Sequence, residues 1–137
     1  MTTDRTRALP ILVVAFNGKV YGLEPTTGRE VWRYEIDGAV PGIAFDGDRV
    51  YATGFGALAA LDYLTGRELW RVKPAFGANK SIVIAQGGLV FIAWTGEVEC
   101  YTRDGQRLWA QPFKGEGYAE TAMGFPGNFV QAFVDAR

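Results

Sequence analysis

Histidine is absent from the 137-residue sequence, and Cys100 is its only cysteine. The chain therefore lacks the commonest general base, the usual partner of a serine or cysteine nucleophile, and the most frequent transition-metal ligand. One cysteine can form neither a cysteine-rich zinc site nor an intrachain disulfide bond, which fits a reducing compartment. We expect a protein that is not an enzyme and that holds no metal and no cofactor.

Net charge and long apolar runs are lacking as well. Fourteen basic and fifteen acidic residues give a formal charge of −1. Nucleic acid and anionic membranes both require a basic surface, so neither is expected as a partner. No apolar run approaches the roughly 20 residues that span a bilayer, and the first residues lack the apolar core and cleavage site of a secretory signal. These features predict a cytoplasmic protein.

What the sequence does contain is a repeated phrase. Residues 23–32 read Leu-Glu-Pro-Thr-Thr-Gly-Arg-Glu-Val-Trp, residues 61–70 repeat the pattern, and residues 101–109 give a version one residue shorter. The phrase ends at tryptophans spaced 38 and 39 residues apart: Trp32, Trp70 and Trp109. The glycines inside it keep the same steps: Gly28, Gly66 and Gly105. A fixed period between about 20 and 50 residues indicates a repeat architecture.

Each phrase is typical of a strand, a turn and a second strand. The carboxylate of Glu24 or Asp62 can accept hydrogen bonds from backbone amides two residues on, and the glycine supplies a positive φ. The tryptophan is too large for a two-stranded ribbon to cover. It needs a neighbouring sheet, and burial of one aromatic side chain contributes about 1.5–3 kcal/mol.

The other half of the period pairs a small residue with an aromatic one. The aromatic positions recur at 39-residue steps: Phe16, Phe55, Trp94 and Phe133. We expect these rings to pack between neighbouring sheets, and a stacking platform for a ligand is the alternative. A further strand precedes each of the last three: Val40–Phe45, Ser81–Ala85 and Glu120–Met123. Each period thus holds four strands joined by tight turns.

Four antiparallel strands in roughly 40 residues describe one blade of a β-propeller. The spacing Asp/Glu-x-x-Thr-Gly-x-x-x-Trp resembles the tryptophan-docking repeat of PQQ-like (quinoprotein-type) β-propellers, over nearly the whole chain from Ile11. The third repeat departs from it, because Thr102-Arg-Asp replaces the acidic-to-threonine segment. The enzymes of that family are much longer and carry a calcium site and a cysteine pair. Cys100 alone cannot form that pair, so the resemblance implies the fold and not PQQ-dependent catalysis.

The strands predict an all-β partial propeller of about three four-stranded antiparallel blades. Residues 1–10 are expected to form a polar leader and residues 11–137 the repeat domain. Three strands lie in Ile11–Glu35, and complete blades in Val40–Val72 and Ser81–Ala110. Known propellers have about four to eight blades, so we expect two copies to complete a ring as a homodimer. A last strand at Phe129–Val134 repeats the register of the first one; whether it is a fifth blade strand or lies elsewhere stays open.

Candidate ligand-binding residues lie in the loops that enter the inner strands. These loops differ between repeats while the frame is constant, as expected where loops carry function. The polar and aromatic candidates are Asn79, Lys80, Tyr118 and Glu120, with plain solvated loop residues as the alternative.

The remaining ionisable residues fit structural roles better. Asp46 and Asp48 share one turn, but two ligands fall short of the six to eight that calcium takes. Glu97 and Glu99 alternate on a strand and are expected to face solvent, and Cys100 is expected to be a packed residue.

These features favour a non-enzymatic module that associates with itself and acts as a protein-interaction or assembly scaffold. The alternative is a protein that binds a small molecule, sugar or peptide near the axis of the assembled ring. An enzyme that uses carboxylates or a borrowed metal ranks last.

Overall fold

The computed structural model describes residues 10–38, 42–54, 56–75 and 81–131. They form thirteen β-strands. Within these ranges no helix occurs that could cross a bilayer. The predicted leader and residues 132–137 lie outside the described ranges, except for Pro10.

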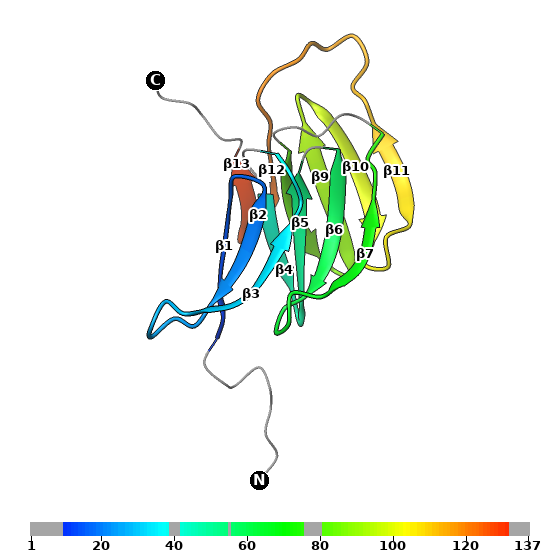
Figure 1. The fold of residues 1–137 in the computed structure, drawn as a ribbon. Helices are drawn as coiled ribbons and strands as arrows, with labels where there is room; N and C mark the ends of the chain where they lie inside the picture. The colour runs from blue at the N-terminus through cyan, green and yellow to red at the C-terminus, as the bar shows by residue number, and fades with distance from the viewer. Residues whose placement is uncertain (1–9, 39–41, 55, 76–80, 132–137) are drawn as a thin grey trace, which may run out of the picture.

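The strands form three sheets and a hairpin, all antiparallel (Figure 1). Blade 1 consists of β1 (Leu12–Phe16), β2 (Lys19–Leu23) and β3 (Glu30–Glu35). Blade 2 consists of β4 (Gly42–Asp46), β5 (Arg49–Gly54), β6 (Ala57–Asp62) and β7 (Glu68–Val72). Blade 3 consists of β8 (Ile82–Gln86), β9 (Leu89–Trp94), β10 (Glu97–Thr102) and β11 (Arg107–Gln111). The hairpin consists of β12 (Ala122–Phe125) and β13 (Asn128–Gln131). The predicted all-β partial propeller is confirmed.

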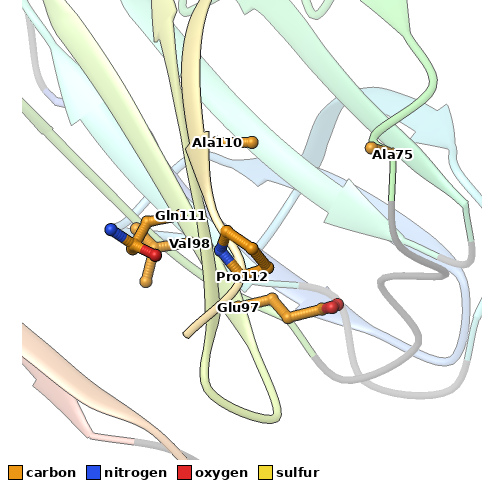
Figure 2. A pocket seen from close by; sticks show the side chains of 6 residues that line it. All are labelled: Ala75, Glu97, Val98, Ala110, Gln111 and Pro112. Carbon is orange, nitrogen blue, oxygen red and sulfur yellow. The ribbon is translucent and has the colours of Figure 1, made fainter. Parts of the chain in front are cut away.

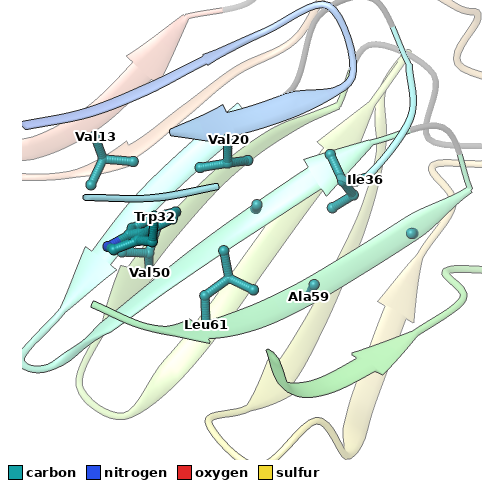
Figure 3. Close-up of a cluster of buried hydrophobic side chains, with 9 residues drawn as sticks. Val13, Val20, Trp32, Ile36, Val50, Ala59 and Leu61 are labelled. Atoms are coloured by element: carbon teal, nitrogen blue, oxygen red, sulfur yellow. The ribbon is translucent and has the colours of Figure 1, made fainter. Parts of the chain in front are cut away.

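The blades pack face to face like the leaves of a fan, and a core lies at each of the two contacts. Between blades 1 and 2, valines and other apolar side chains surround Trp32 (Figure 3). Between blades 2 and 3, Tyr51, Leu58 and Ile92 are completely buried. The alternation of a strand's side chains explains why one sheet serves both cores: Ala52 of β5 points to blade 1 and Tyr51 to blade 3.

Two-residue turns set the register of the hairpins. In the turn after β1, Asn17 and Gly18 both have positive φ (52° and 76°), as tight hairpin turns require. This turn pairs Phe16 with Lys19, and the corresponding turns pair Gly54 with Ala57 and Trp94 with Glu97.

Gly54 is therefore the structural counterpart of Phe16 and Trp94. The 39-residue alignment that placed Phe55 with these two rings is shifted by one residue at that position. This shift arises because the segment between β7 and β8 is longer than the segment between β3 and β4, so the spacing between equivalent residues is not constant. Phe55 and Phe133 themselves lie outside the described residues.

The hairpin β12–β13 lies on the face of blade 3 that points away from blade 2. The register of the repeats predicts β12 as the inner strand, yet β13 is the strand that packs against β8. The side-chain amide of Asn128 donates to the carbonyl of Ala85 (2.8 Å), while Phe125 of β12 contacts Phe91 of β9 with 5.4 Å between ring centroids. The last predicted strand therefore lies beside blade 3.

Candidate functional site

The contact between blades 1 and 2 is centred on the ring of Trp32. This side chain is 6% exposed, and its Nε1 donates to the carbonyl of Tyr63 in the turn after β6 (2.9 Å). The ring lies so close to Gly66 that an ideal Cβ there would stand 2.4 Å from it. Asp62 shapes this turn by accepting from the backbone N–H of Thr65 (2.9 Å). A tryptophan, a glycine and a carbonyl thus form one docking unit.

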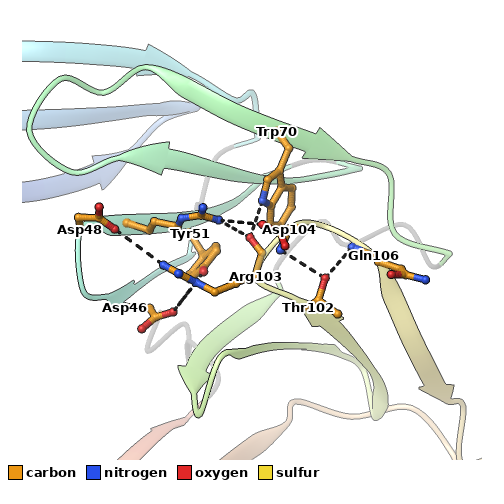
Figure 4. Close-up of polar contacts among 9 residues, drawn as sticks. Asp46, Asp48, Tyr51, Trp70, Thr102, Arg103, Asp104 and Gln106 are labelled. Atoms are coloured by element: carbon orange, nitrogen blue, oxygen red, sulfur yellow. Dashed lines mark hydrogen bonds and ion pairs between the residues drawn. The ribbon is translucent and has the colours of Figure 1, made fainter.

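The same unit recurs between blades 2 and 3. Trp70 Nε1 donates to the carbonyl of Arg103 (2.7 Å), and an ideal Cβ on Gly105 would stand 2.9 Å from its ring. Figure 4 shows Trp70 beside the Arg103 backbone, with Asp46 and Asp48 on the other side of the arginine. The shorter third turn therefore still receives the ring.

Trp109 occupies the same position in blade 3, but its surroundings differ. Its side chain is 45% exposed, and its ring contacts Phe91 of its own blade with 6.3 Å between centroids. All five residues of β11 are exposed, Leu108 among them. The Trp109 ring at the outer edge of blade 3 is consequently open to solvent.

The turn between β2 and β3 of blade 1 has the hydrogen bonds of the docking turns, but no tryptophan ring lies on it in the described chain. The backbone N–H of Gly28 donates to the carbonyl of Glu24 (2.8 Å), and the Thr27 hydroxyl donates to the Glu24 carboxylate (2.7 Å). That hydrogen bond, with Arg29 beside it, lowers the pKa of Glu24 below its ordinary value. In the described chain no atom lies within 4 Å of an ideal Cβ on Gly28, whereas Gly66 and Gly105 are covered by tryptophans.

The free face of blade 1 is also partly apolar. Phe16 is 57% exposed, and its ring lies against Tyr21 of the same sheet (5.7 Å between centroids). The Arg33 guanidinium stands over the other ring of this pair, Tyr21, at 5.2 Å. Phe16 is on the face opposite to Val13 and the first core, so it does not pack between blades 1 and 2. Trp94, its counterpart in blade 3, is partly buried.

Of the four predicted ligand-binding residues, the structure brings two together. Tyr118, which is 86% exposed, and Glu120 lie along one groove beside blade 3, with a volume of about 640 Å³. Phe113 and Met123 add apolar walls, and the Thr121 hydroxyl accepts from the backbone N–H of Gly96 (2.7 Å), which fixes the groove to the turn after β9. Asn79 and Lys80 lie outside the described residues.

A smaller pocket of about 140 Å³ shares the lining residue Val98 with this groove. Its wall is mainly apolar, and its lining is drawn in Figure 2: Ala75, Glu97, Val98, Ala110, Gln111 and Pro112. At this size it can hold a few water molecules and falls below the usual range for ligand pockets of about 300–1,000 Å³.

The prediction that Glu99 faces solvent is wrong. It was predicted to face solvent with Glu97, yet its side chain is 0% exposed. Its carboxylate accepts from the backbone N–H of Ala75 (2.9 Å) in the segment leaving blade 2 and from the Tyr101 hydroxyl (2.9 Å), with Arg107 at 3.4 Å. The alternation in the sequence identified a shared face, but only the packing of blade 2 decides that this face is covered.

The turn carboxylates have protein partners. Arg103 of blade 3 lies 3.6 Å from Asp46 and 3.8 Å from Asp48, so the pair links two blades. Among the described residues, no three histidine, cysteine, aspartate or glutamate side chains gather as a metal site would need. Cys100 is buried, as predicted, and burial raises the pKa of its thiol. A raised thiol pKa disfavours the reactive thiolate.

Radial antiparallel blades, joined by tryptophans on neighbouring turns, define the class of the protein as a partial β-propeller. The family model described as "Outer membrane protein assembly factor BamB" matches residues 16–125. The chain therefore belongs to this PQQ-like β-propeller family. No curated protein matches the chain in sequence.

Solved structures of several kinds share the fold. BamB from Moraxella catarrhalis is 22% identical with a TM-score of 0.63, over 77% of this chain and 33% of that one. A europium-containing methanol dehydrogenase is 23% identical with a TM-score of 0.58, over 74% of this chain and 22% of that one. The WD40 domain of Toxoplasma gondii coronin is 14% identical with a TM-score of 0.69, over 84% and 34%. The chain thus spans about a third or less of these relatives, and identities this low establish the fold alone.

Proposed function

We propose that this chain is a non-enzymatic PQQ-like propeller module that associates with itself, as a homodimer, and serves as a protein-interaction and assembly scaffold. The observation that carries the proposal is the open outer edge of blade 3, where all five residues of β11 are exposed and the Trp109 ring, 45% exposed, has no neighbouring blade on it in the described chain. An aromatic ring left open where its counterparts Trp32 and Trp70 are covered by the next blade indicates an association site. The description of the family as an assembly factor supports the same role.

The absence of catalysis is part of the proposal. Two observations support a non-enzymatic role. The sequence lacks histidine, and the carboxylates of Asp46, Asp48 and Glu99 form contacts between blades. A cytoplasmic location stays a prediction from the sequence.

Sedimentation velocity over a concentration series tests self-association. We expect the 15.0 kDa chain to sediment as a dimer at low micromolar concentration and to dissociate on dilution. A monomer at every concentration up to the millimolar range contradicts the proposal. Capture from the source cell of one partner protein in a fixed ratio to the dimer supports the scaffold role.

A second candidate function is the binding of a small molecule, sugar or peptide in the Tyr118–Glu120 groove. Its support is a groove of sufficient volume with an aromatic ring and a carboxylate on its wall. Thermal-shift measurements with panels of sugars and short peptides test it. Binding should raise the melting temperature of the wild type and not of Glu120→Gln, and Glu35→Gln, an exposed glutamate of blade 1 outside the groove, is the matched control that should keep the shift. A full panel without a shift contradicts this function and leaves the scaffold untouched.

A further inference from the structure

Blades 1 and 3 carry the two unmatched halves of one docking unit. Trp109 is the exposed third member of a series in which Trp32 and Trp70 lie on a glycine turn of the next blade. The turn at Gly28 is the first member of a series in which Gly66 and Gly105 lie beneath a ring. One end of the fan thus offers a ring and the other end offers an uncovered turn.

The position of the acceptor follows from the two formed units. Trp32 donates to the carbonyl of Tyr63, three residues before Gly66, in a turn of the same length as that of blade 1. The corresponding carbonyl in blade 1 is that of Pro25, three residues before Gly28, and Pro25 is exposed. The turn is already formed without a partner, because Glu24 is bonded to the hydroxyl of Thr27 and to the backbone N–H of Gly28.

We propose that Trp109 of one copy docks on the Gly28 turn of a second copy and donates its indole N–H to the carbonyl of Pro25. This inference rests on the proposed self-association and names its contact. One chain cannot satisfy it alone, since its ring and its turn lie on the two outermost blades of the fan (Figure 1). Two copies related by a two-fold axis form the contact twice.

The hairpin β12–β13 defines where blade 1 of the second copy would sit. It covers the inner part of the free face of blade 3, at Phe91 and Ala85, and leaves β11 open. Blade 1 lacks a strand equivalent to β4 and β8 in the described residues. The hairpin of one copy and β1–β3 of the other then make a composite blade of five strands, one more than blades 2 and 3 have. Each copy supplies two complete blades and shares in the composite ones, which gives a six-bladed ring, within the range known for propellers.

Two substitutions test the contact without touching either core. Trp109→Ala removes the exposed ring. Gly28→Asn adds a side chain to the uncovered turn, and asparagine tolerates the positive φ of 76° at this position. Gly47→Asn is the matched control, because Gly47 also has positive φ (60°) and open space around an ideal Cβ but belongs to blade 2. Circular dichroism and urea denaturation check that all three variants fold.

The expected result is a dimer dissociation constant at least about 30-fold weaker for Trp109→Ala and for Gly28→Asn, as for a hot-spot residue, and an unchanged one for Gly47→Asn. An equimolar mixture of Trp109→Ala and Gly28→Asn should recover part of the association. In the mixed dimer one contact carries both changes and the other contact is intact.

The outcomes separate this contact from self-association in general. Wild-type dimers with both variants unaffected overturn the Trp109–Gly28 contact and leave the proposed function standing. Weakened variants that do not recover on mixing overturn the pairing of this ring with this turn. A wild type that stays monomeric overturns the proposed function, and the contact with it.

Discussion

Single residues in this protein act as parts of a unit that spans two blades. Gly66 is needed twice over, because its φ is +71° and because the Trp32 ring occupies the space of a side chain. The need for space under the Trp32 ring depends on the neighbouring blade, whereas the need for a positive φ does not. The two effects can be separated by comparison with Gly47, which has a positive φ and no ring near it.

We predict that Gly66→Ala lowers the free energy of unfolding by about 2–4 kcal/mol, from backbone strain plus the displaced ring. Gly47→Ala, with positive φ and no neighbour near its Cβ, should cost about 1–2 kcal/mol. Urea denaturation measures both. Equal losses would show that the ring moves aside without cost.

Glu99 and Tyr101 form a second residue-scale unit, buried between blades 2 and 3. Burial raises the pKa of Tyr101 well above its ordinary value, and the hydrogen bond to Glu99 raises it further. A tyrosine with a raised folded-state pKa contributes stability that is present below its unfolded pKa and is lost as the pH rises toward the folded pKa.

We therefore predict that stability falls above about pH 10, the ordinary tyrosine pKa, by up to about 1.4 kcal/mol per pH unit for this residue. Tyr101→Phe should reduce the slope, although it loses the hydrogen bond to Glu99. Burial also raises the pKa values of Tyr34 and Tyr51, so part of the slope remains in the variant. Denaturation curves at pH 8 to 11 measure the effect. An identical slope in both proteins would contradict it.

At the scale of elements, the three copies of the phrase are alike in sequence and unlike in what covers them. β3 presents Trp32 to a complete blade, β7 presents Trp70 to a shorter turn, and β11 presents Trp109 to solvent. The contribution of each tryptophan to the free energy of unfolding therefore depends on which blade carries it, and not on the local sequence.

Alanine substitution of each tryptophan should reveal this order in the dissociated chain. Trp32→Ala is expected to cost about 3–5 kcal/mol and Trp70→Ala somewhat less. Trp109→Ala should cost about 1 kcal/mol, because only about half of its ring is covered. Denaturation at concentrations below dimerisation measures the series. Three equal losses would mean that Trp109 is covered within one chain.

At the scale of the whole molecule, stability and association are expected to be linked. A partner that binds the folded chain alone stabilises it in proportion to the logarithm of its concentration. The proposed dimer, formed through the open faces of blades 1 and 3, is therefore expected to make stability depend on protein concentration.

We predict that the melting temperature rises by about 2–6 °C as the protein concentration increases from about 1 to about 100 µM, and that Trp109→Ala flattens this dependence. Differential scanning fluorimetry over the series measures it. A melting temperature independent of concentration in the wild type contradicts linked association.

Much of the fold could be predicted because it repeats. The glycine and tryptophan positions of the phrase identify three turns and two blade contacts, and the strands of the three blades fall within the predicted segments except that β11 ends at Gln111, one residue beyond the predicted Ala110. The candidate site was less predictable. Exposure of Tyr118 agrees with its loop position, whereas the burial of Glu99 depends on the backbone of Ala75, which lies 24 residues away.

The sequence by itself determined the turns, the blades and the family, since local chemistry and a fixed period suffice for these. The tertiary structure alone decided which members of the repeat are covered, which residue is the counterpart of Phe16, and that β13 packs against β8. These depend on connection lengths and on the neighbours of the end blades. A repeat describes its units well, but burial at its two ends is decided by what packs there.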